Sequence, residues 1–205
     1  MNKFDWAVRI GVLASVVLLA GCFASEGSLI SQSGKGLDIE PGRYQEFVQT
    51  RPEWFEKLTP TQQHRCIEVN EGKWLRWCES DSDSGLRAQH SIELLKDGSI
   101  NMDGGTANVR TTPLRDNYYL VSYDPAGTEA GKNEVWYWIM KTEGRVIKLY
   151  VLDCKPFAAK NPTLKLVEDT CAVNSLDQVR SYAMAYLDNS VQTDGPVHMY
   201  RWIED

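Results

Sequence analysis

The chain has 205 residues, which is enough for one domain with its own hydrophobic core. It carries 22 lysines and arginines against 28 aspartates and glutamates, a formal net charge of −6 at pH 7. This acidity argues against nucleic acid as a partner, because such binding depends on clustered cations. It also argues against an electrostatic attachment to anionic lipid, so acyl chains would have to hold the protein on a membrane.

The first 21 residues have the features of a secretory signal peptide. Lys3 and Arg9 precede an uncharged apolar run at residues 10–20. That run is shorter than the about 20 residues that a membrane-spanning helix needs. It ends in Leu19-Ala20-Gly21-Cys22, which resembles the lipobox of bacterial lipoproteins. An ordinary cleaved signal peptide and an uncleaved anchor are the alternatives.

The lipobox resemblance implies a place in the cell. It implies that a diacylglyceryl group is attached to the Cys22 thiol, that the chain is cleaved before Cys22, and that acyl chains hold the protein on the membrane. Residue 23 is Phe, where many lipoproteins retained at the inner membrane have Asp. The resemblance therefore implies the bacterial outer membrane, with the protein facing the periplasm.

The mature chain is predicted to have two parts. Residues 22–40 comprise the lipidated cysteine and a Ser- and Gly-rich flexible tether with a reach of roughly 20–25 Å. Residues 41–205 form a single β-rich globular domain. Its first part, residues 41–63, contains Pro52 and Pro60, which forbid one long helix and indicate short helical turns covering one end of the domain.

Residues 66–78 predict a β-hairpin. With a three-residue loop at Glu71-Gly72-Lys73, cross-strand partners have residue numbers that sum to 144. The resulting pairs are Ile67 with Trp77, Val69 with Leu75, Glu68 with Arg76 and Cys66 with Cys78. Apolar, charged and cysteine residues all find matching partners in this one register, which supports the hairpin.

Disulfides are predicted from the cysteine count. Besides Cys22 the chain has Cys66, Cys78, Cys154 and Cys171, and an even number in an exported protein allows three connectivities. The hairpin favours Cys66–Cys78, which leaves Cys154–Cys171.

No metal is predicted: the acidic stretch 79–85 lacks the glycine and glutamate spacing of a calcium loop, so it is interpreted as a solvated turn.

The next strands are predicted from alternation and turn signals. A hairpin over residues 86–103 turns at Asp97-Gly98, and strands follow at 106–112 and 117–124. His90 falls on an apolar face, which is typical of a buried structural histidine. The alternation breaks after Leu94, which a β-bulge would explain.

Residues 134–153 predict the strongest hairpin, turning at Glu143-Gly144 with partners summing to 287. One face is apolar and is expected in the core: Trp136, Trp138, Met140, Ile147, Leu149 and Val151. The other face carries Tyr137, Tyr150 and two lysines and is expected to be half exposed. Tyr137, Tyr150 and Trp74 therefore form a predicted binding surface for stacking, against the alternative that these rings pack the sheet.

The end of the chain predicts one helix and one strand. Ser175 is a candidate N-cap with Gln178 completing a capping box, so a helix over 175–188 is expected before a last strand at 197–203. The fold class is mostly β (α+β), an antiparallel meander forming a sheet or barrel-like domain. This layout, with Gly72-Lys73-Trp74 in the Gly-x-Trp form of their first motif, resembles the lipocalins; no ligand is carried over.

The sequence contains no motif that names a reaction. A nucleophile elbow, a phosphate-binding loop and a metalloprotease helix are absent, and no cofactor is predicted. The three histidines, His64, His90 and His198, leave a dispersed catalytic triad as an alternative. We therefore expect a non-catalytic, lipid-anchored domain that binds an envelope protein or glycan. A lipocalin-like carrier of a small apolar ligand and an envelope hydrolase are the alternatives.

Overall fold

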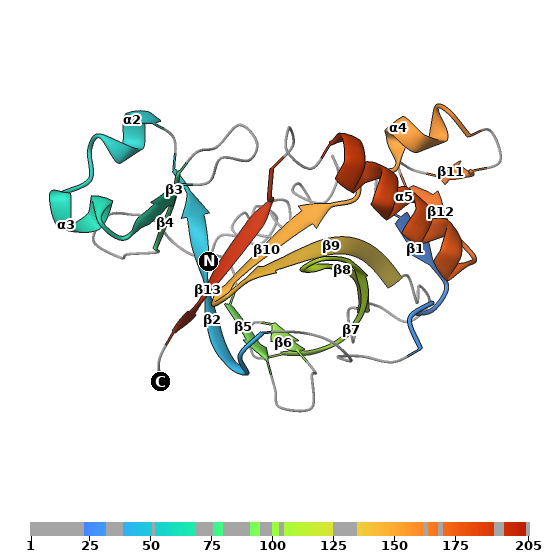
Figure 1. Ribbon diagram of the computed structural model, residues 1–205, viewed down its shortest axis with the longest axis horizontal. Helices are drawn as coiled ribbons and strands as arrows, with labels where there is room; N and C mark the ends of the chain where they lie inside the picture. The colour runs from blue at the N-terminus through green and yellow to red at the C-terminus, as the bar shows by residue number, and fades with distance from the viewer. Residues whose placement is uncertain are drawn as a thin grey trace, which may run out of the picture.

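The computed structural model describes most of the chain after residue 22 and shows a mostly β protein with one long helix near the C-terminus and a final strand (Figure 1). The described residues are 23–31, 39–50, 52–68, 76–79, 91–94, 100–102, 105–124, 135–161, 164–167, 170–190 and 195–203. The predicted signal peptide, Cys22, Trp74, His90 and residues 80–85 of the acidic stretch lie outside them.

Eight antiparallel strands form a barrel-like sheet. Their pairings run from β10 through β13, β2, β5, β6, β7, β8 and β9, and β9 pairs in turn with β10. The strands are β2 (Gly42–Gln49), β5 (Ser91–Leu94), β6 (Ile100–Met102), β7 (Gly105–Arg115), β8 (Tyr118–Asp124), β9 (Val135–Glu143), β10 (Val146–Val151) and β13 (His198–Ile203).

This ring of pairings opens at two places. The first three residues of β9 pair with β1 (Phe23–Ser25) instead of β10. β1 continues to β12 (Thr170–Ala172) and β11 (Leu166–Val167). The second half of β2 pairs with β4 (Arg76–Glu79) instead of β5, and β4 pairs with β3 (Cys66–Glu68). The sheet therefore branches into additional strands on opposite sides.

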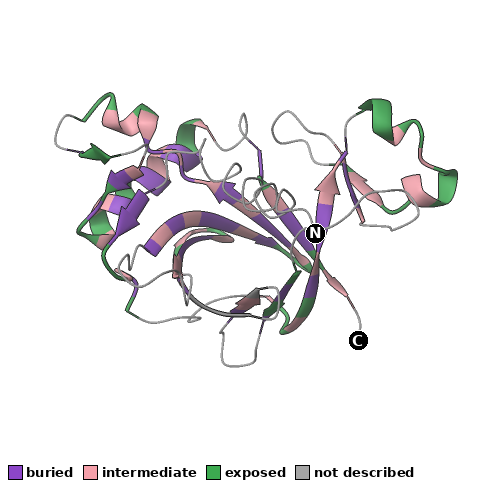
Figure 2. Ribbon diagram, turned by 180° about the vertical axis from the view of Figure 1, so that it is seen from behind, coloured by how far each residue is buried: buried purple, intermediate pink, exposed green. Residues whose placement is uncertain are grey.

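Buried residues run along the barrel-like sheet, as the purple segments of Figure 2 show, and they occupy both faces of β8 but only one face of β5. Inward-facing residues form one cluster that contains Tyr44, Tyr119, Met140, Ile147 and Tyr200. The outward face of β8, β9 and β10 packs against α5 (Leu176–Asn189) in a second cluster that contains Leu120, Tyr137, Ile139, Tyr150, Tyr182, Ala183 and Tyr186. One helix thus covers one outer side of the sheet and leaves the interior to the strands.

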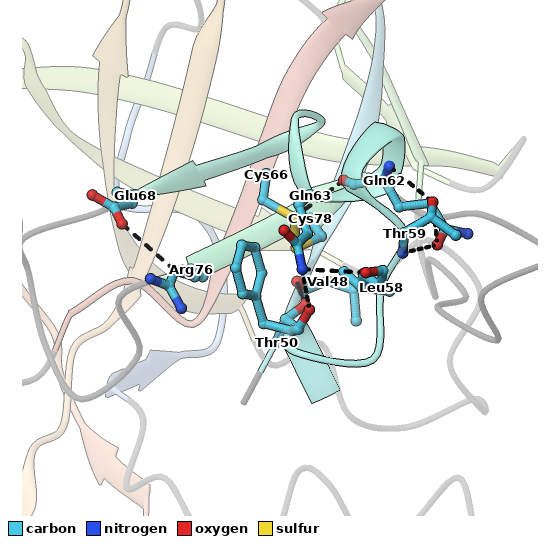
Figure 3. The surroundings of a disulfide bond; sticks show 11 residues. Val48, Thr50, Leu58, Thr59, Gln62, Gln63, Cys66, Glu68, Arg76 and Cys78 are labelled. Carbon is cyan, nitrogen blue, oxygen red and sulfur yellow. Dashed lines mark hydrogen bonds and ion pairs between the residues drawn. A yellow bond between two sulfur atoms is a disulfide. The ribbon is translucent and has the colours of Figure 1, made fainter. Parts of the chain in front are cut away.

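The predicted hairpin over residues 66–78 is confirmed over its described part. Cys66 faces Cys78, Ile67 faces Trp77 and Glu68 faces Arg76. Figure 3 shows this region, with the Glu68–Arg76 ion pair at 3.5 Å.

Two short helices, α2 (Pro52–Phe55) and α3 (Pro60–Gln63), pack beside the hairpin. The Gln63 side chain donates to the carbonyl oxygens of Phe55 and Leu58, and Thr59 and Gln62 form a capping box at α3. We call α2, α3, β3 and β4 the disulfide lobe.

Both predicted disulfides are present. Cys66–Cys78 has a Cα–Cα distance of 4.0 Å and Cys154–Cys171 one of 6.0 Å. The second bond joins the short helix α4 (Lys155–Ala158), which Cys154 precedes, to β12. The predicted C-terminal helix is also confirmed, with the Ser175 hydroxyl accepting from the Gln178 amide at its N-terminus.

The expected tether is wrong for residues 23–31. Phe23 and Ile30 are buried, and β1 lies between β9 and β12. Ser28 hydrogen-bonds Ser122 at 2.8 Å, and the Arg110 guanidinium donates to the Ile30 carbonyl at 3.0 Å. The polar run 25–28 separates its apolar residues, so the segment shows no periodicity. It is fixed by strand pairing and by hydrogen bonds to the outer face of the sheet.

Two other sequence expectations need correction. Residues 42–49 form a strand, β2, where short helical turns were expected. Glu46 and the adjacent Phe47 are both buried, one on each face, so the strand lacks a simple apolar alternation. The β9–β10 hairpin has partners summing to 289, such as Met140 with Leu149, because the turn is at Gly144-Arg145 with Gly144 at φ +58°. A shift of two in this sum leaves each residue on its predicted face.

Candidate functional site

The predicted aromatic binding surface is not exposed where the structure describes it. Tyr137 and Tyr150 are both fully buried in the cluster beneath α5. The Tyr137 hydroxyl is 2.8 Å from the Ser25 hydroxyl and accepts from the Leu29 amide at 2.9 Å. Tyr137 therefore holds the N-terminal segment in place, and the face expected to be half exposed is core because α5 and β1 cover it.

A different aromatic group lies at one end of the barrel interior. Trp138 stacks on His198 with centroids 5.8 Å apart and planes 6° apart. The ring centroid of Tyr123 lies 6.4 Å from that of Trp138 and 6.3 Å from that of Trp136. The ring centroids of His198 and Tyr200 are 6.3 Å apart. These five rings form a row across β8, β9 and β13. Tyr123, Trp136, Trp138 and His198 are all half-buried, so the row is reachable from solvent.

A carboxylate completes this row. The Glu46 Oε1 atom is 2.7 Å from His198 Nδ1, and the Glu46 side chain is only 9 % exposed. Glu46 pairs with Tyr200 across β2 and β13, so its side chain shares the inward face with Tyr200 and with His198 two residues away. We call Glu46, Tyr123, Trp136, Trp138 and His198 the aromatic end.

Strand pairing brings the aromatic end together from distant parts of the chain. Residues 46 and 198 are 152 positions apart, and they meet because β13 inserts between β2 and β10. His198 was expected only as a member of a dispersed triad, and Glu46 was not predicted because β2 was not expected to be a strand. Because Glu46 places a charge between Tyr44 and Val48 on the same face, no period-two apolar signal marked it in the sequence.

The opposite end of the interior carries a pocket of about 540 Å³. It is lined by Ile39, Glu40, Asp116, Asn117, Tyr119, Thr142, Glu143, Gly144 and Arg145. Its polar groups bind one another: Arg145 Nε is 3.0 Å from Glu40, and the Asn117 amide donates to the Thr142 carbonyl. Arg145 also lies over the Trp202 ring at 4.0 Å. Because these polar groups bond to one another, we interpret this end of the interior as structural and not as a binding site.

Glu143 at that end forms a charged cluster with two lysines. Its carboxylate is 2.6 Å from Lys141 Nζ and 2.9 Å from Lys148 Nζ. Burial raises the pKa of Glu143, but the hydrogen bonds and charges of Lys141 and Lys148 together outweigh burial, so the net pKa lies below its usual value. The Lys148 side chain is almost buried, so this carboxylate contributes to the stability of the β9–β10 hairpin.

The aromatic end can recognise a ligand by ring stacking and by hydrogen bonds to Glu46 and His198. The ring neighbours of His198 among the described residues include the Trp138 indole and the Tyr200 phenol. Within the same described residues, no group of three or more His, Cys, Asp or Glu is arranged to hold a metal ion.

Comparisons with known proteins give no indication of function. No protein-family model matches the chain, and no curated protein or solved structure is significantly similar to it. Among the helices that the structure describes, none combines the length and the apolar character needed to cross a membrane.

Proposed function

We propose that this protein is a lipid-anchored binding module of the bacterial cell envelope, held at the outer membrane by acyl chains on Cys22 and facing the periplasm. Its ligand is an envelope glycan bound at the aromatic end, without catalysis. The observation that carries the proposal is the Glu46–His198 pair placed beside a row of partly exposed rings at the end of an otherwise apolar interior.

This combination of groups suits a sugar. The half-buried rings of Trp136, Trp138 and Tyr123 offer apolar surface for the C–H face of a pyranose. A carboxylate and an imidazole supply the acceptor and donor groups that fix the orientation of hydroxyls. Placing such a pair in a barrel interior costs desolvation, and polar groups kept at that cost are typical of functional sites.

The alternative of an apolar-ligand carrier has less support. A carrier needs a large apolar cavity open at one end. Here the middle of the interior is filled by large side chains that are at most 2 % exposed: Tyr44, Met140, Ile147 and Tyr200. The described interior therefore favours binding at the end of the barrel over enclosure within it.

Cosedimentation with insoluble peptidoglycan tests the proposal. The mature chain carrying Cys22→Ser should bind, and Trp136→Ala should weaken binding about tenfold, which corresponds to about 1.4 kcal/mol for one lost aromatic contact. Glu46→Gln, which keeps the side-chain shape, should weaken binding by removing the charge. Trp54→Ala is the matched control, because Trp54 is exposed on α2, outside the aromatic end. Equal binding of all four proteins would refute a glycan site at the aromatic end.

A further inference from the structure

The start of the mature chain is fixed to the folded domain. Phe23 is fully buried, with its ring 4.9 Å from that of Tyr182 on α5 and 6.1 Å from that of Phe157 on α4. β1 is paired on both sides, parallel with β12 and antiparallel with β9. Since Cys22 directly precedes Phe23 in the chain, acyl chains on Cys22 would leave the protein at a defined point with no spacer.

Strand register places an exposed apolar pair close to that point. Phe23 pairs with Cys171 on β12, and Cys171 pairs with Leu166 on β11. Two strand spacings separate the Cα atoms of Phe23 and Leu166 by about 10 Å. Leu166 is 47 % exposed and Val167 is 57 % exposed, and they form a two-residue strand that pairs only with β12 among the described strands.

Lysines precede this pair in the chain, and acidic residues follow it. Residues 155–167 contain Lys155, Lys160 and Lys165 and no acidic residue, and Glu168 and Asp169 come directly after Val167. Lys160 and Lys165 are exposed, and Lys155 begins α4, whose Phe157 packs against Phe23. Lysines beside exposed aliphatic residues are the combination that enters a phospholipid headgroup region, because the cations meet phosphates and the aliphatic groups meet acyl chains.

From this juxtaposition we infer that the surface formed by α4 and β11, with Lys160, Lys165, Leu166 and Val167, lies in the headgroup region of the membrane and sets the orientation of the protein. We call it the membrane face. The inference rests on the lipid anchor proposed above. The disulfide lobe lies at the other end of the molecule's long axis in Figures 1 and 2, so it points away from the bilayer.

Two labelled variants of the acylated, full-length protein test the orientation. A single cysteine replaces either Val167 (Val167→Cys) or Trp54 (Trp54→Cys), the latter being 53 % exposed on α2 in the disulfide lobe. Each is labelled with the polarity-sensitive fluorophore NBD and reconstituted into vesicles of phosphatidylethanolamine and phosphatidylglycerol. We expect the label at 167 to shift to the blue, brighten severalfold and be quenched by nitroxide lipids, and the label at 54 to stay unchanged.

Other outcomes would overturn the inference in distinguishable ways. If the intact mass shows acyl chains and the protein floats with vesicles, but the label at 167 stays in water, the orientation is wrong and the anchor stands. A mass without acyl chains would refute the anchor and the orientation with it. Shielding of the label at 167 in cells but not in vesicles would show that a protein covers this face. Leu166→Cys repeats the measurement if the first substitution disturbs β11.

Discussion

Phe23 begins strand β1 directly after Cys22, the proposed lipid-attachment site, and replacing it is the sharpest stability test of the structure. The side chain is fully buried and stacks on Tyr182. Burying such a ring contributes about 2–3 kcal/mol, and stacking adds about 0.5–1.5 kcal/mol. With the cavity that remains, Phe23→Ala should lower the free energy of unfolding by about 3–5 kcal/mol.

The measurement is urea unfolding of the mature chain carrying Cys22→Ser, followed by far-ultraviolet circular dichroism. The slope against urea should stay unchanged, so the loss would appear in the midpoint. Trp54→Ala is the control, and it should change the free energy of unfolding by less than about 0.5 kcal/mol because Trp54 is exposed. A loss below about 1 kcal/mol for Phe23→Ala would refute the packing of β1 and restore a flexible tether.

Two further predictions concern the disulfides and the charged cluster. Dithiothreitol should reduce Cys66–Cys78 before Cys154–Cys171, as read by alkylation and mass mapping, because Cys154 and Cys171 are both fully buried whereas Cys66 is partly exposed; the reverse order would contradict the described burial. The closed loops are of similar length, so each bond should contribute about 3 kcal/mol. The depressed pKa of Glu143 means that its charge stabilises the fold above the unfolded-state value of 4.5 and that this contribution is lost as pH falls through the lower folded value. The Glu143 side chain is 39 % exposed, so solvent screens its ion pairs, and Glu143→Gln should lower the free energy of unfolding by about 0.5–1 kcal/mol at neutral pH. The substitution should also flatten the acid limb of a thermal-unfolding profile, and an unchanged limb would exclude this role.

Features that depend on neighbours in the chain were predictable from the sequence. The hairpin register at Cys66–Cys78 follows from three kinds of matched pair, and the helix at Ser175 follows from its cap and its apolar stripe. These signals are local, because turn chemistry and periodicity act over a few residues. The second disulfide then followed from the cysteines that remained.

The candidate site was not predictable, because it depends on contacts between distant segments. Glu46 meets His198 only because β13 pairs with β2 and β10 at once. Tyr137 is core because the segment after Phe23 and the helix α5 cover it, and neither contact leaves a trace in the alternation of β9. A strand buried on both faces shows no preferred side in its sequence, so tertiary packing alone decided which aromatic residues are structural and which remain accessible to a ligand.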